Sequence, residues 1–164
     1  MPTITFSKKE KVLASFILVA ALTRLLPHPP NFAPITAMAL FSGVFFDKKA
    51  IAFLVPLLAM VLSDLFLGFY TISLFVYLSF FFITLLGRWM KKVHIGTVLI
   101  GSSLFFVVSN LGVWLLRYPP TIEGLLTCFT LAIPFFGTAL LGDVFYSIVL
   151  VYGFKAAEKR FQLA

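Results

Sequence analysis

Long apolar runs alternate with short polar segments along the whole chain. A helix that crosses a membrane needs about 20 mostly apolar residues, and six runs approach that length. The expected helices cover residues 11–26, 34–46, 50–69, 71–87, 95–116 and 124–154. Because only short connections separate these runs, the pattern predicts a single transmembrane domain over residues 1–164, an all-α bundle of six membrane-spanning helices.

Two of these runs depart from the ordinary length of a membrane span. The run 34–46, PITAMALFSGVFF, is short, so the region before it is expected to complete its depth in the membrane. The run 124–154 is too long for one straight span. Pro134 lies inside it and removes a backbone hydrogen bond, which predicts either a kink or a break into two pieces.

The composition makes the bilayer the solvent for most of the chain. Of the 164 residues, 61% are hydrophobic and 12% are charged, and a soluble fold of this size cannot bury so much apolar surface. The net charge of +7 would suggest nucleic acid as the partner of a soluble protein. Nearly all the basic residues lie in short clusters between the apolar runs, so we interpret them as loop charges and expect no nucleic acid partner.

The basic clusters also orient the predicted helices. With a cytoplasmic N-terminus, all but two of the 13 Lys and Arg residues fall on the cytoplasmic side, as the positive-inside rule requires. They are Lys8, Lys9, Lys11, Lys48, Lys49, Arg88, Lys91, Lys92, Lys155, Lys159 and Arg160. An odd number of spans would scatter these charges to both sides. We therefore expect both termini in the cytoplasm and the chain in a bacterial inner membrane.

The two remaining arginines, Arg24 and Arg117, are expected on the outer side, where each leads into a proline pair. Asp64 and Asp143 follow a proline by about two turns in PLLAMVLSD and PFFGTALLGD, near the outer end of a helix. Charged side chains at the membrane centre cost about 2.5–3.5 kcal/mol, and those that persist usually face a bundle interior or a wet cavity. Two interpretations stay open: buried ion pairs that hold helix ends together, or groups that line an outward-facing pocket.

The pocket interpretation draws further residues from the outer side. The proline-rich segment after the first helix contributes His28 and Asn31. Asn110, Trp114 and Arg117 are spaced i, i+4 and i+7, which places them on one helix face and would suit a small polar ligand with a flat ring. Trp114 and Tyr118 equally fit an aromatic belt with a snorkelling arginine at the membrane interface. The candidate ligand contacts are Arg24, His28, Asn31, Asp64, Asn110, Trp114, Arg117, Tyr118, Asp143 and Tyr146.

Metal, cofactor and catalytic chemistry find no support in the residues. Cys128 is the only cysteine, so this chain can form neither an internal disulfide nor a cysteine-based metal site. His28 and His94 fall on opposite sides of the predicted topology, so they cannot hold one haem between them. The chain has no HExxH, P-loop or GxSxG motif. We expect no metal, no cofactor and no enzymatic activity.

Three stretches resemble a family of small, uncharacterised bacterial inner-membrane proteins. They are RLLPHPPNFAPITAMALFSGVFF, VPLLAMVLSDLFLG and NLGVWLLRYPPTIEGLLTCFTLAIPFFGTALLGDVF. The hallmarks are the HPPNF loop and the block that contains IPFF and GD. The resemblance covers most of the chain, and it implies a membrane protein without an assigned activity.

More remotely, the six-helix layout, the cytoplasmic termini and the third helix, with its proline, Ser-Asp and glycine, resemble the substrate-binding S components of energy-coupling factor (ECF) vitamin transporters. That resemblance implies a membrane subunit that captures a vitamin-like micronutrient from the outer face, with an ECF scaffold protein and ATPase subunits as its partners. S components commonly show an AxxxA pattern in the first helix. Here Ala14 is followed by Leu18, and the nearest such spacing is Ala33 to Ala37.

Two functions stay open on the sequence. The first is the substrate-binding membrane subunit of a micronutrient transporter, with the lipid bilayer and a small molecule as its partners. The alternative is a structural or accessory subunit of a larger membrane protein complex. The 21 Phe residues, some of them consecutive as in 80–82, give apolar helix faces that either lipid or a partner helix could cover.

Overall fold

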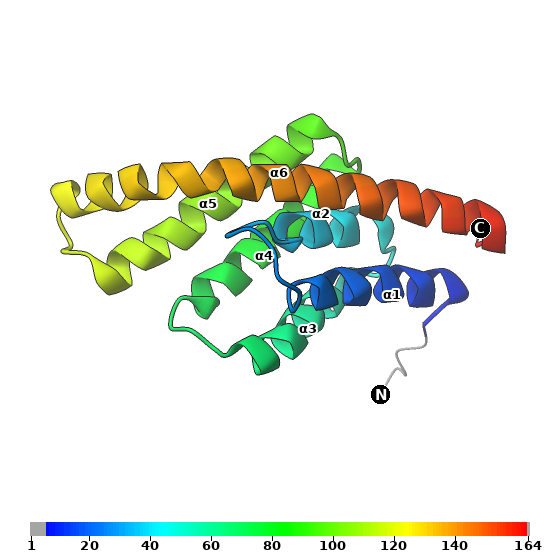
Figure 1. Ribbon diagram of the computed structural model, residues 1–164. Coiled ribbons are helices and arrows are strands. Elements are labelled where there is room, and N and C mark those ends of the chain that lie inside the picture. Colours follow the sequence, from blue (N-terminus) through cyan, green and yellow to red (C-terminus); the bar gives the residue numbers. More distant parts are fainter. Residues whose placement is uncertain (1–5, 164) are drawn as a thin grey trace.

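The computed structural model describes residues 6–163, which form six α-helices and no strand (Figure 1). The helices are α1 (Lys8–Thr23), α2 (Ile35–Phe45), α3 (Lys49–Leu67), α4 (Ser73–Met90), α5 (Ile95–Arg117) and α6 (Ile122–Phe161). The prediction of an all-α chain with six helices is confirmed. α1 ends at Thr23 because Pro27 and the prolines after it disfavour helical backbone.

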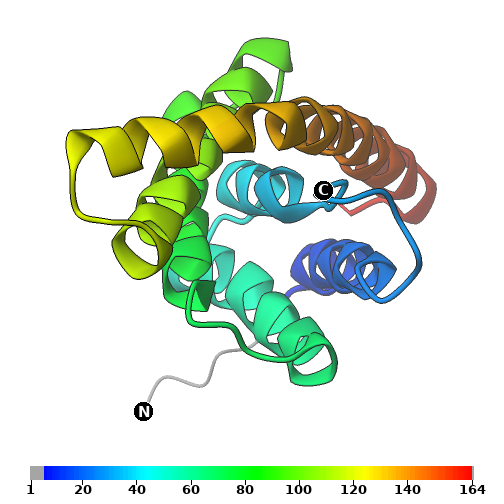
Figure 2. The same ribbon diagram turned by 60° about the vertical axis from the view of Figure 1, so that its left-hand side comes forward.

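Helix α2 forms the centre of the bundle, and the other helices form a ring around it. α2 contacts every other helix, while α1 packs on α3, α3 on α4, α4 on α5, α5 on α6 and α6 on α1. Figure 2 shows α2 enclosed by this ring. The centre of the core is therefore a helix rather than a seam between helices.

The sequence of α2 suits a central position. Residues 36–43 are all buried, as expected for a helix that is hydrophobic on every side. Gly43 faces Gly87 of α4, and a Cβ added to Gly43 would lie only 2.3 Å from the Thr84 carbonyl oxygen. The absence of side chains at both positions lets the two backbones approach closely.

Four helices, α3, α4, α5 and α6, are long and apolar enough to cross a membrane, which indicates a multi-pass membrane protein. The α1 helix has 16 residues and α2 has 11. At about 1.5 Å per residue, α2 covers only about half of a hydrocarbon core of about 30 Å. The described residues form six helices, as predicted. Of these, α3, α4, α5 and α6 are long and apolar enough for a full membrane span, whereas α1 and α2 are shorter.

Helix α6 is a continuous helix of 40 residues that includes Pro134. In Figure 2 its first part (yellow) lies across the view and its last part (red) recedes, so the axis bends along its length. The helix therefore follows the first of the two expected outcomes, a change of direction without a break. It also continues to Phe161, beyond the predicted end at residue 154. The prediction placed the end of the helix at the end of the apolar run, whereas the helix continues through the polar residues that follow.

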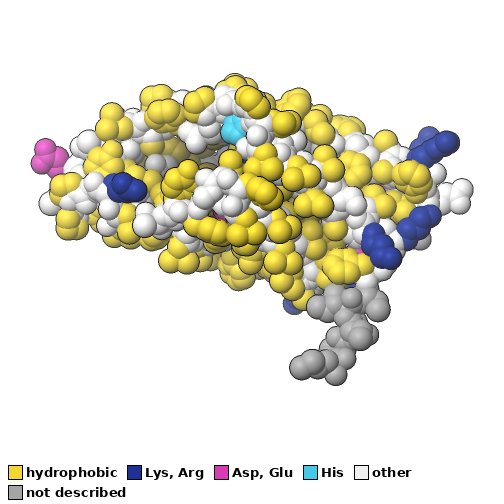
Figure 3. Space-filling model, turned by 60° about the horizontal axis from the view of Figure 1, so that its bottom comes forward, with side chains coloured by type: hydrophobic (Ala, Val, Ile, Leu, Met, Phe, Trp, Pro, Cys, Tyr) yellow, Lys and Arg dark blue, Asp and Glu magenta, His cyan; other side chains and the backbone are white. Residues whose placement is uncertain are grey.

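The basic clusters gather at one end of the bundle, which we call the basic end. Lys9 of α1 pairs with Glu158 of α6 at 3.8 Å. Arg88 of α4 donates a hydrogen bond to the Phe46 carbonyl oxygen, between α2 and α3, at 3.0 Å. Figure 3 shows most of the visible Lys and Arg side chains at this end (right). Whether the basic end faces the cytoplasm stays a prediction of the positive-inside rule.

Glu10 joins the first turn of α1 to the connection between α2 and α3 at the basic end. Its Oε2 atom accepts hydrogen bonds from the Ser7 N–H at 2.8 Å and from Lys48 Nζ at 3.2 Å. The Ser7 hydroxyl accepts from the Glu10 N–H in return, which completes a capping box. The Ser7 N–H and the Lys48 ammonium lower the pKa of the Glu10 carboxyl below its ordinary value of 4.5, although burial acts in the opposite direction.

Because folding lowers this pKa, ionised Glu10 stabilises the fold at neutral pH, and the contribution is lost as the pH falls through the folded-state pKa. Glu10→Gln keeps the capping geometry without the charge, so we expect it to lower the stability by about 1 kcal/mol at neutral pH. The difference should shrink below pH 4.5. Thermal unfolding in detergent across this pH range measures it.

Glu158→Gln is the matched control for Glu10→Gln. It removes an ion pair at the same end whose side chains are 31% and 38% exposed. Exposed pairs contribute at most about 1 kcal/mol, so its effect should be small. A Glu10→Gln deficit that did not change with pH would contradict the role assigned to the carboxylate.

Candidate functional site

A cavity of about 530 Å³ lies at the end of the bundle opposite the basic end. The ends of α1 and α3, the start of α4 and the middle parts of α5 and α6 contribute to its walls. The N-terminal end of α2 closes it toward the core. A cavity of this volume lies within the range of small-molecule sites.

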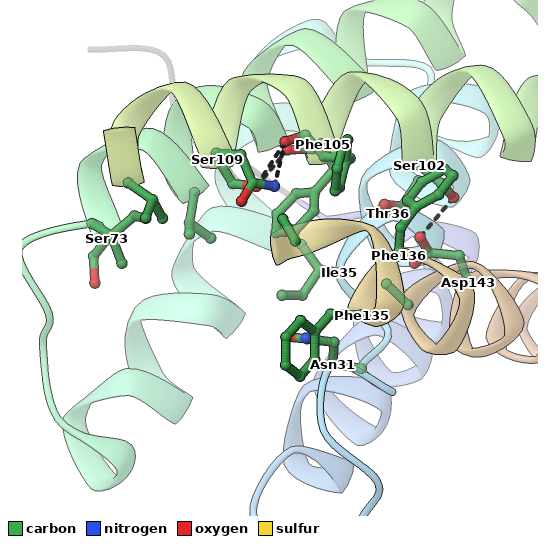
Figure 4. Close-up of a pocket in the computed structure, with 18 of the residues that line it drawn as sticks. Asn31, Ile35, Thr36, Ser73, Ser102, Phe105, Ser109, Phe135, Phe136 and Asp143 are labelled. Atoms are coloured by element: carbon green, nitrogen blue, oxygen red, sulfur yellow. Dashed lines mark hydrogen bonds between the residues drawn. The ribbon is translucent and has the colours of Figure 1, made fainter. Parts of the chain in front are cut away.

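The walls of the cavity are mainly apolar, with phenylalanines from α5 and α6 and a limited set of polar groups. The polar lining residues are Arg24, His28, Asn31, Thr36, Asp64, Tyr70, Ser73, Ser102, Ser109, Asn110 and Asp143. Figure 4 shows Thr36, Ser102 and Asp143 together on one side of the cavity and Ser73 on the other. Within residues 6–163, no three His, Cys, Asp or Glu side chains are grouped closely enough to hold a metal ion.

Arg24 and Asp64 form a largely buried ion pair in the cavity wall. Arg24 Nη2 lies 2.8 Å from Asp64 Oδ1, and the two side chains are 13% and 7% exposed. Arg24 Nη1 also donates to the Ser63 hydroxyl and to the Met60 sulfur. The Tyr77 hydroxyl donates to the second carboxylate oxygen, Asp64 Oδ2, at 2.6 Å. Both charges are thus compensated, as the ion-pair interpretation of the sequence requires.

Asp143 is compensated differently, because no cationic side chain pairs with it in the described part of the chain. The Ser102 hydroxyl donates to Asp143 Oδ2 at 2.7 Å. The carboxyl group also lies against the backbone N–H groups of Thr36 and Ala37 in the first turn of α2. That turn has Pro34 at its N-cap and no capping side chain of its own. Asp143 of α6 therefore supplies the anion that a helix N-terminus attracts.

Thr36 adds a buried hydroxyl group beside this carboxylate. Its side chain is fully buried and lines the cavity next to Asp143 (Figure 4). The hydroxyl lies close enough to the Asp143 carboxyl group to interact with it, although it forms no hydrogen bond of good geometry among residues 6–163. Thr36 and Asp143 together therefore present a hydroxyl and a carboxylate to a molecule in the cavity.

The proline-rich segment between α1 and α2 forms one wall of the cavity. Asn31 adopts left-handed backbone with φ 62°, which asparagine tolerates better than most residues. The following Phe32 packs against Phe145 and Tyr146 of α6, with ring centroids 5.7 and 5.8 Å apart. These ring contacts anchor the segment to α6, and His28 and Asn31 then line the cavity.

The other candidate ligand contacts do not line the cavity. Trp114 Nε1 donates to a carbonyl oxygen of the loop after α5 at 3.0 Å, so the indole is engaged by that loop. Arg117 and Tyr118 lie at the far end of α5, and Arg117 forms no ion pair with Asp143 or any other described acidic residue. Tyr146 supports the proline-rich segment instead of the cavity. The stripe from Asn110 toward the end of α5 is thus not the face that meets the cavity.

The face of α5 that does meet the cavity runs from Ser102 to Val113. Ser102, Phe105, Ser109 and Asn110 are spaced i, i+3, i+7 and i+8, and all line the cavity. The sequence interpretation included only the last of them. Ser102 and Ser109, which lie seven residues apart and so on one face of a mostly apolar helix, were the signal that could have identified this face.

Comparison with known proteins identifies a family and no further relative. The profile of a family of unknown function, DUF6580, matches residues 5–164. No curated protein and no solved structure matches the chain. The match extends over all six helices, so the cavity lies within the part of the chain that the family shares.

Proposed function

Because the chain belongs to the family of unknown function DUF6580, we propose its function from the site: it is the substrate-binding membrane subunit of a micronutrient transporter, similar in type to the ECF S components. One feature of the cavity supports this most. Asp143 and Thr36 place a carboxylate without a cationic partner and a buried hydroxyl at the wall of a cavity of about 530 Å³. Only hydrogen-bond donors compensate this carboxylate, so it can also accept from a cationic or donating group of a bound molecule.

The position of the cavity supports capture from the outer face. It lies opposite the basic end, and the positive-inside rule assigns the basic end to the cytoplasm. With this orientation, the cavity lies on the outer side of an inner membrane. Arg24, an exception to the positive-inside pattern, then occurs in the wall of the site rather than in a connecting loop.

The lining predicts the chemistry of the ligand. Phe105 and Phe136 lie on facing helices of an apolar wall, which suits a flat or apolar body. Asp143 suits a cationic or hydrogen-bond-donating group, and the Thr36 hydroxyl can donate to an acceptor beside it. A vitamin-type molecule with a ring and an amine or amide group has this combination.

Transport further requires partners, for which we propose an ECF scaffold and its ATPase subunits. The Ala33 to Ala37 spacing does not supply their docking surface, because Ala33 lines the cavity and Ala37 is fully buried. Purification in mild detergent with identification of co-purifying chains tests this part. Recovery of ATPase chains supports it, whereas other stoichiometric membrane subunits without ligand binding favour the accessory-subunit alternative.

A thermal-shift screen of the purified protein against vitamins and their precursors tests ligand binding. One ligand should raise the unfolding midpoint by an amount that grows with its concentration. Asp143→Asn keeps the shape of the side chain without its charge, and we expect it to bind that ligand at least about tenfold more weakly.

Asp47→Asn is the matched control, because Asp47 is exposed and lies outside the cavity. It should bind as tightly as the unaltered protein. Equal affinity of Asp143→Asn and the unaltered protein would exclude a contact between this carboxylate and the ligand. A flat response of the unaltered protein to a broad panel would count against the proposed function itself.

A further inference from the structure

A second cavity, of about 240 Å³, lies at the basic end between the start of α5 and the second half of α6. Its floor consists of Val98, Ser147 and Val151, which are 3%, 5% and 8% exposed. Its rim is exposed and includes His94, Ile95, Ile148, Tyr152 and Lys155. The cavity is thus an apolar groove with basic and aromatic groups along its edge.

The groove follows one face of α6. Ser147, Val151 and Lys155 are spaced i, i+4 and i+8 and all line it. At about 1.5 Å per residue, these eight positions cover about 12 Å along the helix axis. α5 and α6 are both apolar enough to cross a membrane, so lipid can reach a groove between them.

The basic groups on the rim are available to an anion. The Thr97 N–H donates to His94 Nδ1 at 3.2 Å, so the proton of the neutral imidazole is on Nε2, which can donate. Lys155 contacts the Tyr152 ring at 5.9 Å from the centroid. No acidic side chain among residues 6–163 pairs with Lys155. An anion near these two residues would therefore replace no ion pair.

Ser147 provides an independent sign of an occupant inside the groove. Its side chain is buried, and its hydroxyl makes no hydrogen bond with any part of the described chain. A buried hydroxyl in an apolar groove needs an acceptor, since leaving it without one is costly. The ester carbonyl of a lipid is an acceptor that can enter such a groove together with an acyl chain.

We propose that this groove binds an anionic phospholipid, with its phosphate near His94 and Lys155 and one acyl chain along the floor. Three properties of the site support a lipid: the apolar floor, the position within the basic end, and an exposed tyrosine at the edge. Tyrosine is enriched at the level of lipid headgroups, and basic residues next to membrane spans attract anionic lipids. This site is separate from the cavity proposed for the transported molecule, and it does not depend on that function.

The test measures the unfolding midpoint of the purified chain in nonionic detergent with added dioleoyl phosphatidylglycerol or dioleoyl phosphatidylcholine. The anionic lipid should raise the midpoint more than the zwitterionic one with the same chains. Lys155→Gln should require about fivefold more phosphatidylglycerol for the same shift, since a basic residue near an anionic surface contributes about 1 kcal/mol. Ser147→Leu, which fills the floor without changing the charge, should also reduce the shift.

Lys159→Gln removes an equal charge one turn further along α6, outside the groove, and should respond to phosphatidylglycerol like the unaltered protein. Equal losses in the two lysine variants would indicate a general attraction to the basic end and overturn the proposal. Inorganic phosphate alone should produce no shift, and an equal shift with phosphate would identify a free-anion site instead. Equal stabilisation by both lipids would contradict recognition of the headgroup.

Discussion

Replacing Arg24 with alanine should lower the free energy of unfolding by about 3–5 kcal/mol, because it leaves a buried Asp64 carboxylate without its cation. The two charged groups are 2.8 Å apart, and both side chains are largely buried. The Tyr77 hydroxyl remains bonded to the carboxylate but carries no charge to compensate it. Unfolding by SDS in mixed micelles measures the loss.

A double variant separates the effect of an unpaired charge from the effect of lost volume. Arg24→Met with Asp64→Leu removes both charges and keeps apolar bulk, so it should recover much of the lost stability. A comparable loss in the double variant would mean that packing, and not charge, dominates. If Arg24→Ala keeps its stability but no longer binds the transported molecule, the pair is a ligand contact and not a structural one.

Gly43→Ala should lower the stability by about 1–3 kcal/mol, which is typical of overpacking a close contact. The new Cβ would lie 2.3 Å from the Thr84 carbonyl oxygen and 3.1 Å from Gly87 Cα. These are backbone atoms of α4, so a side-chain rotation cannot relieve the overlap and the helices must separate. The same unfolding measurement in mixed micelles detects the change.

Gly137→Ala is the matched control for Gly43→Ala. Gly137 also lies inside a helix, α6, but a Cβ added there meets no atom within 4 Å. Alanine favours a helix over glycine by about 1 kcal/mol, so this substitution should be neutral or stabilising. A similar loss of stability in both variants would contradict the close α2–α4 contact.

The number and type of the helices could be predicted from the sequence, because in a membrane every backbone group must be bonded within its own helix. Apolar runs therefore translate directly into helices. The central place of α2 could not be predicted, since a helix that is apolar on all sides can be covered by lipid as well as by protein. The contacts that place it in the centre, such as Gly43 against Gly87, join segments that are far apart in the sequence.

The candidate site was partly predictable for a related reason. A charged or amide side chain inside or beside an apolar run is costly, so five residues stand out without any structure: Arg24, Asp64, Asn110, Arg117 and Asp143. All of them except Arg117 line the cavity. The serines of α5 did not stand out, because a hydroxyl can bond to its own helix backbone and so needs no partner elsewhere.

Three properties follow from local composition and from the cost of transfer into a membrane: which segments become helices, which of their residues are too polar for lipid, and where the basic residues gather. How each charge is compensated depends instead on contacts between distant parts of the chain. Asp64 meets Arg24, whereas Asp143 meets the N-terminus of α2, and Arg117 has no carboxylate partner among residues 6–163. Compensation acts over only a few ångströms, and the packing of the ring around α2 brings these groups that close.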